Sequence, residues 1–138
     1  MRRIAFVNQK GGTGKTTTVV NLAGALQQKG HDVLVVDLDQ QGNATTWLQQ
    51  KEHQESLCNY LINKPDTPPF YNTVWDGLDV LPGGEPTRDA YDALQLHAAQ
   101  GGKGAERLKR LLDRDDGKYD YVLIDCPPAL GFISNTAF

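Results

Sequence analysis

The fold of this chain is decided by the stretch Asn8-Gln9-Lys10-Gly11-Gly12-Thr13-Gly14-Lys15-Thr16-Thr17-Thr18, which directly follows the apolar run Ile4-Ala5-Phe6-Val7. This order predicts a strand, then a glycine-rich turn, then a helix. Glycines in such a turn adopt positive φ and let backbone N–H groups crowd around phosphate oxygens. The helix that follows adds unsatisfied N–H groups and the positive end of its dipole. The stretch therefore predicts a binding site for a nucleoside triphosphate.

The general P-loop pattern G-x-x-x-x-G-K-[ST] assigns roles to two of these residues. Lys15 is placed to meet the β- and γ-phosphates, and the hydroxyl of Thr16 is placed to meet Mg²⁺. The chain departs from the pattern at one position, because Gln9 stands where the first glycine is expected, and an additional Lys10 lies inside the loop. The alternative is a glycine-rich turn with two solvated lysines. We favour the P-loop because the preceding strand, the following helix and the Lys-Thr pair are all in register.

The departure itself is informative. The run Lys10-Gly11-Gly12-Thr13-Gly14-Lys15-Thr16-Thr17 resembles the deviant Walker A motif of the ParA/MinD family of P-loop ATPases. The resemblance implies that these eight residues bind ATP and that Lys15 acts in catalysis. It also implies that Lys10 is catalytic in trans, reaching across an ATP-sandwich dimer to the phosphates bound by the partner.

A second segment combines a buried strand with two carboxylates. The apolar run Val33–Val36 is typical of a strand covered on both faces of a parallel sheet, and Asp37-Leu38-Asp39-Gln40-Gln41-Gly42-Asn43 follows it. Acids two residues apart at the carboxyl end of a strand point to the same side as the P-loop. The alternative is that the pair caps a helix that starts near Ala44.

This segment is similar to the switch I motif of the same family, usually D-x-D-P-Q-G-N, with Gln40 where proline is common. The resemblance implies that Asp37 supports the Mg²⁺ shell. It implies that Asp39 orients or activates the water that attacks the γ-phosphate.

A third apolar strand also ends in an acid, in the run Tyr119-Asp120-Tyr121-Val122-Leu123-Ile124-Asp125-Cys126-Pro127-Pro128. The end of this run resembles the Walker B carboxylate and the D-x-P-P switch II of the family, which implies that Asp125 binds Mg²⁺ through water. Cys126 is expected to be a small buried spacer, because no histidine lies nearby in sequence to activate it as a nucleophile.

Length and composition limit the class of protein. The chain has 138 residues, which suit one domain, and a net charge of −3, so it lacks a global basic field for nucleic acid. Its cysteines, Cys58 and Cys126, have no metal-ligand spacing and indicate a reducing cytoplasm. No signal peptide or membrane-spanning run is expected. The family runs to about twice this length, so we interpret residues 1–138 as a P-loop ATPase domain without its C-terminal half.

Further elements are expected along the chain. The first helix should run from the P-loop through Leu26 and end before Gly30, and shorter helices are expected at 44–48 and 56–62. Leu78–Leu81 is favoured as the third parallel strand, or as part of a hairpin with Val74-Trp75. A helix is expected at 86–99, and Gly101–Gly104 is interpreted as a connector because it follows a helix and lacks Lys-Ser/Thr.

The last expected helix, 105–114, carries Arg107, Lys109, Arg110 and Arg114, interpreted as a solvated face, with a DNA-contacting patch as the alternative. Trp47 and Trp75 are expected to be packing residues, and His31, His53 and His97 to be surface residues or partly hydrogen-bonded. Alternating strands and helices predict an α/β P-loop NTPase fold, a parallel β-sheet flanked by helices on both faces.

The resemblance implies a slow, dimerisation-switched ATPase of the ParA type, acting in plasmid or chromosome partitioning with ATP and Mg²⁺. Expected partners are a second copy of the chain, non-specific DNA and a ParB-like activating protein, and the expected location is the cytoplasm, at the nucleoid. One alternative is a MinD-like membrane-positioning ATPase, which would use a C-terminal amphipathic helix. Another is a P-loop metabolic ligase, and a third is a non-functional remnant. The missing half is expected to hold the adenine-contacting residues.

Overall fold

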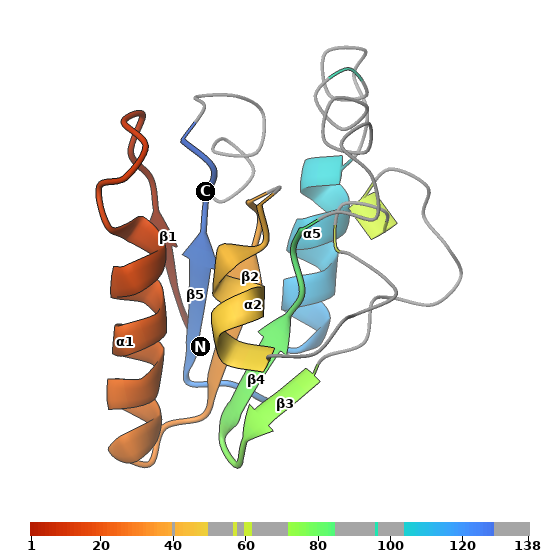
Figure 1. Cartoon of the computed structure of the whole chain (residues 1–138). Coiled ribbons are helices and arrows are strands. Elements are labelled where there is room, and N and C mark those ends of the chain that lie inside the picture. The colour runs from red at the N-terminus through yellow and green to blue at the C-terminus, as the bar shows by residue number, and fades with distance from the viewer. Residues whose placement is uncertain are drawn as a thin grey trace.

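The computed structural model of the chain describes residues 1–39, 41–49, 57, 60–61, 72–84, 96 and 104–128. Strands and helices alternate through most of this part of the chain (Figure 1). In chain order the elements are β1 (Arg2–Phe6), α1 (Lys15–Gln28), β2 (Val33–Asp37), α2 (Asn43–Gln49), β3 (Asn72–Trp75), β4 (Leu78–Leu81), α5 (Gly104–Arg114) and β5 (Tyr121–Asp125).

The strands form one sheet in the order β1-β5-β2-β4-β3. Four of them are parallel, and β3 alone runs antiparallel, at the edge beside β4. Leu78–Leu81 is therefore both the expected parallel strand and one arm of the expected hairpin. The fold class is confirmed, with one correction: the sheet has an antiparallel edge strand. The reason is the tight turn at Asp76-Gly77, where Gly77 has a φ of 78°, since so short a connection can only reverse the chain.

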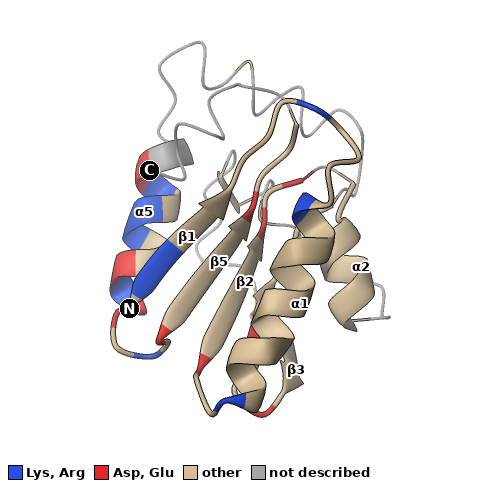
Figure 2. Ribbon diagram, turned by 90° about the vertical axis from the view of Figure 1, so that its left-hand side faces the viewer, with Lys and Arg blue, Asp and Glu red and all other residues tan. Residues whose placement is uncertain are grey.

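Register places the carboxyl ends of the central strands at one edge of the sheet. Asp125 of β5 lies opposite Phe6 of β1 on one side and Asp37 of β2 on the other. Figure 2 shows the acidic ends of β5 and β2 close to the basic residue that begins α1. This arrangement is the one predicted from parallel strands that each end in a functional loop.

Helices cover both faces of the sheet, as expected. The face covered by α1 and α2 includes the buried residues Val19, Ala23, Val33, Val35, Ala44, Leu48, Leu78, Val80 and Leu123. The opposite face, covered by α5, includes Leu34, Val36, Leu57, Leu61, Leu81, Leu108, Leu111, Leu112, Val122 and Ile124. Figure 2 shows α5 on one side of the sheet and α1 with α2 on the other. All five residues of β2 are buried because the strand has neighbours on both edges and helices on both faces.

Helix α1 begins and ends at glycines. Gly14 precedes it with a φ of 81°, and Gly30 follows it with a φ of 84°. The N–H of Gly30 donates to the carbonyl of Gln27 at 2.9 Å, and the N–H of His31 donates to that of Leu26 at 3.2 Å. These two bonds form a Schellman ending, so the predicted stop at Gly30 is confirmed.

Helix α5 matches the expected span, but its basic residues are not all solvated. Lys109 pairs with Asp113, and Arg110 pairs with Glu106, each four residues apart on an exposed face. Arg107 instead lies partly buried and donates to the carbonyl of Leu61 at 2.6 Å. The interpretation of Arg107 as a solvated residue was therefore wrong, because this long side chain reaches a carbonyl of a neighbouring segment.

The other expectations have mixed outcomes. Trp75, on the edge strand, is 57% exposed, so its interpretation as a packing residue was wrong. His31 is partly exposed and lies 3.4 Å from a carboxylate oxygen of Asp120, as expected of a surface or partly hydrogen-bonded histidine. The helices expected at 56–62 and 86–99, the connector, His53, Cys58 and His97 fall largely or wholly outside the described residues. Among the helices that the structure describes, none combines the length and the apolar character needed to cross a membrane.

Candidate functional site

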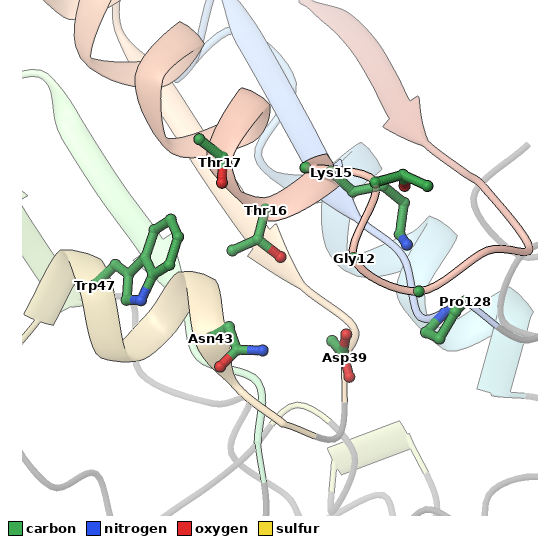
Figure 3. Close-up of a pocket in the computed structure, with 11 residues that line it drawn as sticks. Gly12, Lys15, Thr16, Thr17, Asp39, Asn43, Trp47 and Pro128 are labelled. Carbon is green, nitrogen blue, oxygen red and sulfur yellow. The ribbon is translucent and has the colours of Figure 1, made fainter.

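A pocket of about 360 Å³ lies where the loops that follow β1, β2 and β5 meet (Figure 3). It is lined by Gly11, Gly12, Thr13, Gly14, Lys15, Thr16, Thr17, Asp39, Asn43, Trp47 and Pro128. All the residues predicted for nucleotide binding are thus brought together except Lys10, and one of the two switch I acids joins them. The predicted sites come from three segments far apart in sequence, so the fold has assembled them.

The glycine-rich loop is open above its backbone. Gly12 and Gly14 have φ angles of 70° and 81°, a region that residues with a Cβ rarely adopt. A Cβ added at Gly11, Gly12 or Gly14 would find no other atom within 4 Å. Gly12 and Gly14 are therefore required by the backbone turn and not by crowding from the protein, and the space over the loop is free for a ligand.

Asn8 braces this loop, a role that the sequence reasoning missed. Its side-chain oxygen accepts a hydrogen bond from the N–H of Lys10 at 3.1 Å, and its carbonyl accepts one from Nζ of Lys15 at 3.3 Å. The hydroxyl of Thr13 donates to the carbonyl of Lys10 at 3.2 Å. An asparagine two residues before a turn is a typical local cap, and this spacing is the signal that could have identified it.

The N-terminus of α1 is suited to an anion. No side chain caps it, and its first turn contains no acidic residue. Lys15, the first residue of the helix, forms no ion pair with any carboxylate that the structure describes. The free N–H groups, the helix dipole and the uncompensated ammonium therefore all favour negative charge in the pocket.

Asp125 is a buried carboxylate without a partner. Neither of its oxygens has a hydrogen-bond donor within the described part of the chain, although the residue is fully buried. Burial raises the pKa of Asp125, the nearby Thr16 hydroxyl opposes this rise, the charge of Asp39 adds to it, and that of Lys15 opposes it. Because a buried acceptor normally has a donor or a cation, this site calls for a positively charged ligand.

The donor set fits Mg²⁺. Thr16 lines the pocket beside Asp125, and both offer the hard oxygen atoms that this ion prefers. The described residues contain no group of three or more histidine, cysteine or acidic side chains that would form a complete protein cage. Mg²⁺ does not require one, since it usually binds one or two protein oxygens together with phosphates and waters.

Asp37, in contrast to Asp125, accepts hydrogen bonds at both of its carboxylate oxygens. Its Oδ1 accepts a hydrogen bond from the N–H of Asp39 at 3.0 Å, and its Oδ2 accepts from the N–H and the hydroxyl of Thr45 at 2.9 and 2.7 Å. Burial raises the pKa of Asp37 to about 7, although the bonds from Thr45 oppose the rise. The alternative that Asp37 caps the first turn of the following helix is thus confirmed. Asp37 is not among the residues that line the pocket, and its role in the Mg²⁺ shell stays a prediction.

Asp39 does line the pocket, and the helix-cap alternative is wrong for it. Its Oδ1 accepts from the N–H of Gln41 at 3.0 Å, which closes a local turn ahead of α2. Among the described residues, none donates to its other oxygen. Figure 3 places its carboxylate between Asn43 and the P-loop. One carboxylate oxygen is therefore available to accept a proton or orient a water beside the phosphate site.

Lys10 lies at the tip of the loop, exposed to solvent. Within the described part of the chain its side chain has no hydrogen-bond or ion-pair partner. Its expected action in trans involves a second molecule, so that role stays a prediction.

Two residues of α2 complete the pocket wall, and the sequence reasoning missed both. Asn43 and Trp47 lie four residues apart, which places them on one face of the helix, toward the pocket (Figure 3). Trp47 is 53% exposed, so its interpretation as a packing residue was wrong. The four-residue spacing of Asn43 and Trp47, at the end of the switch I motif and just after it, could have indicated that both face the site.

Cys126 is the buried spacer that was expected. It is fully buried, and burial raises the pKa of its thiol to about 12. A thiol in this environment stays protonated at neutral pH and is inert as a nucleophile.

Comparisons with known proteins give the family of this chain. A family model described as an AAA domain matches residues 1–138. The chain is 40% identical over 137 residues to the sporulation initiation inhibitor protein Soj of Bacillus subtilis, covering 97% of this chain and 53% of that protein. It is 43% identical over 130 residues to the chromosome-partitioning ATPase Soj of Thermus thermophilus, covering 94% and 47%. The chain thus spans about half the length of the curated relatives it matches.

Solved structures share the fold. Cobyrinic acid a,c-diamide synthase from Mycobacterium smegmatis, with a bound ATP analogue and magnesium, has a TM-score of 0.82 and 33% identity, covering 99% of this chain and 56% of that one. The cell division ATPase MinD from Pyrococcus furiosus has a TM-score of 0.76 and 30% identity, covering 99% and 54%.

Proposed function

Because the chain belongs to the ParA/MinD family of P-loop ATPases, we propose that it forms the ATP-binding and hydrolysing part of a ParA-type partitioning ATPase. The observation that carries the proposal is the pocket lined by the P-loop, Lys15 and Asp39, with the buried and unpartnered Asp125 next to Thr16. Together they supply positive charge for phosphates, oxygens for a cation and a carboxylate for water.

In the proposed mechanism the triphosphate lies along the loop. The backbone N–H groups of the loop and the ammonium of Lys15 neutralise the phosphate oxygens. Thr16 and Asp125 would hold Mg²⁺, and the bound ion would supply positive charge to the phosphate oxygens. The free oxygen of Asp39 orients a water molecule for in-line attack on the γ-phosphate.

Lys10 is proposed to act on the phosphates bound by a second copy of the chain. Its exposure and its lack of a partner among the described residues leave it free to do so. Hydrolysis would then depend on dimerisation and would be slow in the monomer, because no other residue here resembles an arginine finger. An ATPase whose association state follows its nucleotide acts as a switch more than as a metabolic catalyst.

The partitioning role rests on the relatives. One of them is named a chromosome-partitioning ATPase, and the B. subtilis relative is a sporulation initiation inhibitor. We propose that the full-length protein binds non-specific DNA as an ATP dimer at the nucleoid, in the cytoplasm. A ParB-like partner would stimulate its hydrolysis.

Two other functions share this pocket. The similarity in structure to a cobyrinic acid a,c-diamide synthase favours a P-loop ligase as the second candidate. The similarity to MinD favours a membrane-positioning ATPase as the third. The three differ in what the ATP-bound protein captures, namely a small carboxylic acid, DNA or a lipid surface.

The test is co-sedimentation of the full-length protein with duplex DNA and, separately, with anionic liposomes, each with and without MgATP. ATP-dependent capture by DNA that weakens with added salt supports the partitioning function. Capture by liposomes alone would support the membrane-positioning function. Capture by neither, with ATP turnover that requires a carboxylic acid and ammonia donor, supports the ligase.

A further inference from the structure

The segment between β2 and α2 is bonded to the loop that follows β4, residues Pro82–Gly84. The N–H of Gly83 donates to the hydroxyl oxygen of Thr45 at 2.9 Å, and the N–H of Gly84 donates to the carbonyl of Asp39 at 3.1 Å. These bonds hold two segments side by side that are at least 38 positions apart in sequence. Neither this loop nor Thr45 belongs to any of the three motifs that bind or cleave the nucleotide.

Thr45 links the two loops through a single hydroxyl. Its proton is donated to Oδ2 of Asp37 at 2.7 Å, and its oxygen accepts from Gly83. Thr45 is 2% exposed and Asp37 is fully buried, so water does not compete for these bonds. A chain of hydrogen bonds in such surroundings is strengthened by its low local dielectric and fixes the groups that it joins.

The backbone of Asp39 is held from both sides. Its N–H donates to Asp37, and its carbonyl accepts from Gly42 at 3.0 Å and from Gly84. The position of its carboxylate in the pocket is therefore determined by Asp37 and by the loop after β4. The same bonds set where α2 begins, and α2 carries Asn43 and Trp47.

The close approach of the two loops excludes any side chain at Gly83. A Cβ added there would lie 2.7 Å from Cγ of Asp37 and 2.8 Å from its carbonyl carbon, and closer still to its carbonyl oxygen. The atoms in the way are mainly backbone, so they cannot rotate aside. Gly83 is thus required by the contact with Asp37.

We propose that Asp37 and Thr45 are positioning residues, which lock the β2–α2 segment onto the Pro82–Gly84 loop and thereby hold Asp39 at the phosphate site. Asp37 then acts on the reaction through Asp39 and not through direct contact with the substrate. The catalytic part of this inference rests on the proposed ATPase function, whereas the lock itself does not.

The test compares three variants of the protein at its natural full length. Thr45→Val removes the hydroxyl and keeps the shape, and Thr45→Ser keeps the hydroxyl. Thr46→Val is the matched control, because Thr46 is the next residue of α2 and is exposed. Hydrogen exchange of the peptides that cover 38–46 and 82–84 is measured alongside kcat and KM for MgATP.

We expect Thr45→Val to speed hydrogen exchange in both peptides. We also expect it to lower kcat about 10- to 100-fold, because displacing a catalytic group by about 1 Å can slow a reaction by that much. KM for ATP should change less than about twofold, because the P-loop contacts are intact. Thr45→Ser should restore both the exchange rates and kcat, and Thr46→Val should leave both unchanged.

Each other outcome overturns part of the inference. Unchanged exchange in Thr45→Val would overturn the lock. Faster exchange with an unchanged kcat would overturn the positioning role. A wild-type protein that binds ATP but never hydrolyses it would overturn the proposed ATPase function and the catalytic part of this inference, while exchange would still decide the lock.

Discussion

Asp37 and Asp125 lie opposite each other in register at the ends of the neighbouring strands β2 and β5, yet their carboxylates have contrasting environments. Asp37 accepts three hydrogen bonds from protein donors, whereas Asp125 accepts none from the described residues. Two acids that look equivalent in the sequence thus have different tasks. One organises the protein around the pocket, and the other is left without a hydrogen-bond donor among the described residues.

The first prediction concerns Asp125. Asp125→Asn should raise the Tm of the ligand-free protein by about 2–6 °C, because burying an unpaired charge costs on the order of 1 kcal/mol or more. The same variant should lose the additional stabilisation that MgATP gives the wild type, since the cation loses its ligand. Thermal unfolding with and without MgATP measures both effects. A variant that is less stable and still responds to Mg²⁺ would remove Asp125 from the metal site.

Substitutions of the two P-loop lysines should affect different properties: ATP binding for Lys15 and dimerisation for Lys10. Lys15→Ala should weaken ATP binding on the order of 100-fold, because charge-assisted hydrogen bonds contribute about 1.5–3 kcal/mol each. Lys10→Ala should bind ATP as a monomer and fail to dimerise. Calorimetry and analytical ultracentrifugation with MgATP measure these properties. Lys29→Ala, at the far end of α1, is the control and should behave as wild type. Normal dimerisation of Lys10→Ala would exclude its action in trans.

Substitution of Asp39 should stop hydrolysis without preventing binding. Asp39→Ala removes the oxygen that faces the pocket and leaves the loop and Lys15 intact, so ATP should bind and the ATP dimer should accumulate. Phosphate release and size-exclusion chromatography with MgATP measure the two effects. Hydrolysis at the wild-type rate would show that another group orients the water.

Trp47 should report on nucleotide binding. It is one of two tryptophans and lies in the pocket wall, whereas Trp75 lies on the edge strand β3. Its indole fluorescence should change when MgATP enters the pocket. Trp47→Phe should abolish the change, and Trp75→Phe, the matched control, should keep it. A response that survives in Trp47→Phe would contradict the placement of this residue at the site.

Two glycine substitutions should have opposite effects on stability. Gly83→Ala should destabilise the fold by about 2–4 kcal/mol, because its methyl group would overlap backbone atoms of Asp37. Gly24→Ala should stabilise it by about 0.5–1 kcal/mol, since Gly24 lies inside α1 and its Cβ would meet no atom within 4 Å. Denaturant unfolding measures both. A tolerated Gly83→Ala would be evidence against the close packing of the two loops.

Much of the site was predictable from local patterns. Parallel strands have their carboxyl ends at one edge of the sheet, so Gly11–Gly14 and Asp39, which follow two of these strands, were bound to lie near Asp125, which ends a third. The antiparallel turn of β3, the carbonyl contact of Arg107 and the exposure of Trp47 were not predictable in this way. Each depends on which neighbour a side chain or strand meets, and composition and spacing do not specify that neighbour.

The sequence by itself determined that this chain carries a P-loop, and that its acids stand at strand ends near that loop. These features depend on local properties: the conformation of glycines, the position of apolar runs and the handedness of single crossovers. Each involves only a short part of the chain, so the sequence is enough to predict it. Only the tertiary structure decided that Asp37 has hydrogen-bond donors and that Asp125 has none among the described residues. The donors that occupy Asp37 come from Thr45, which Gly83 holds in place from 38 residues away, whereas no such donor reaches Asp125 among the described residues. A hydrogen bond between distant segments exists only once packing has brought them together.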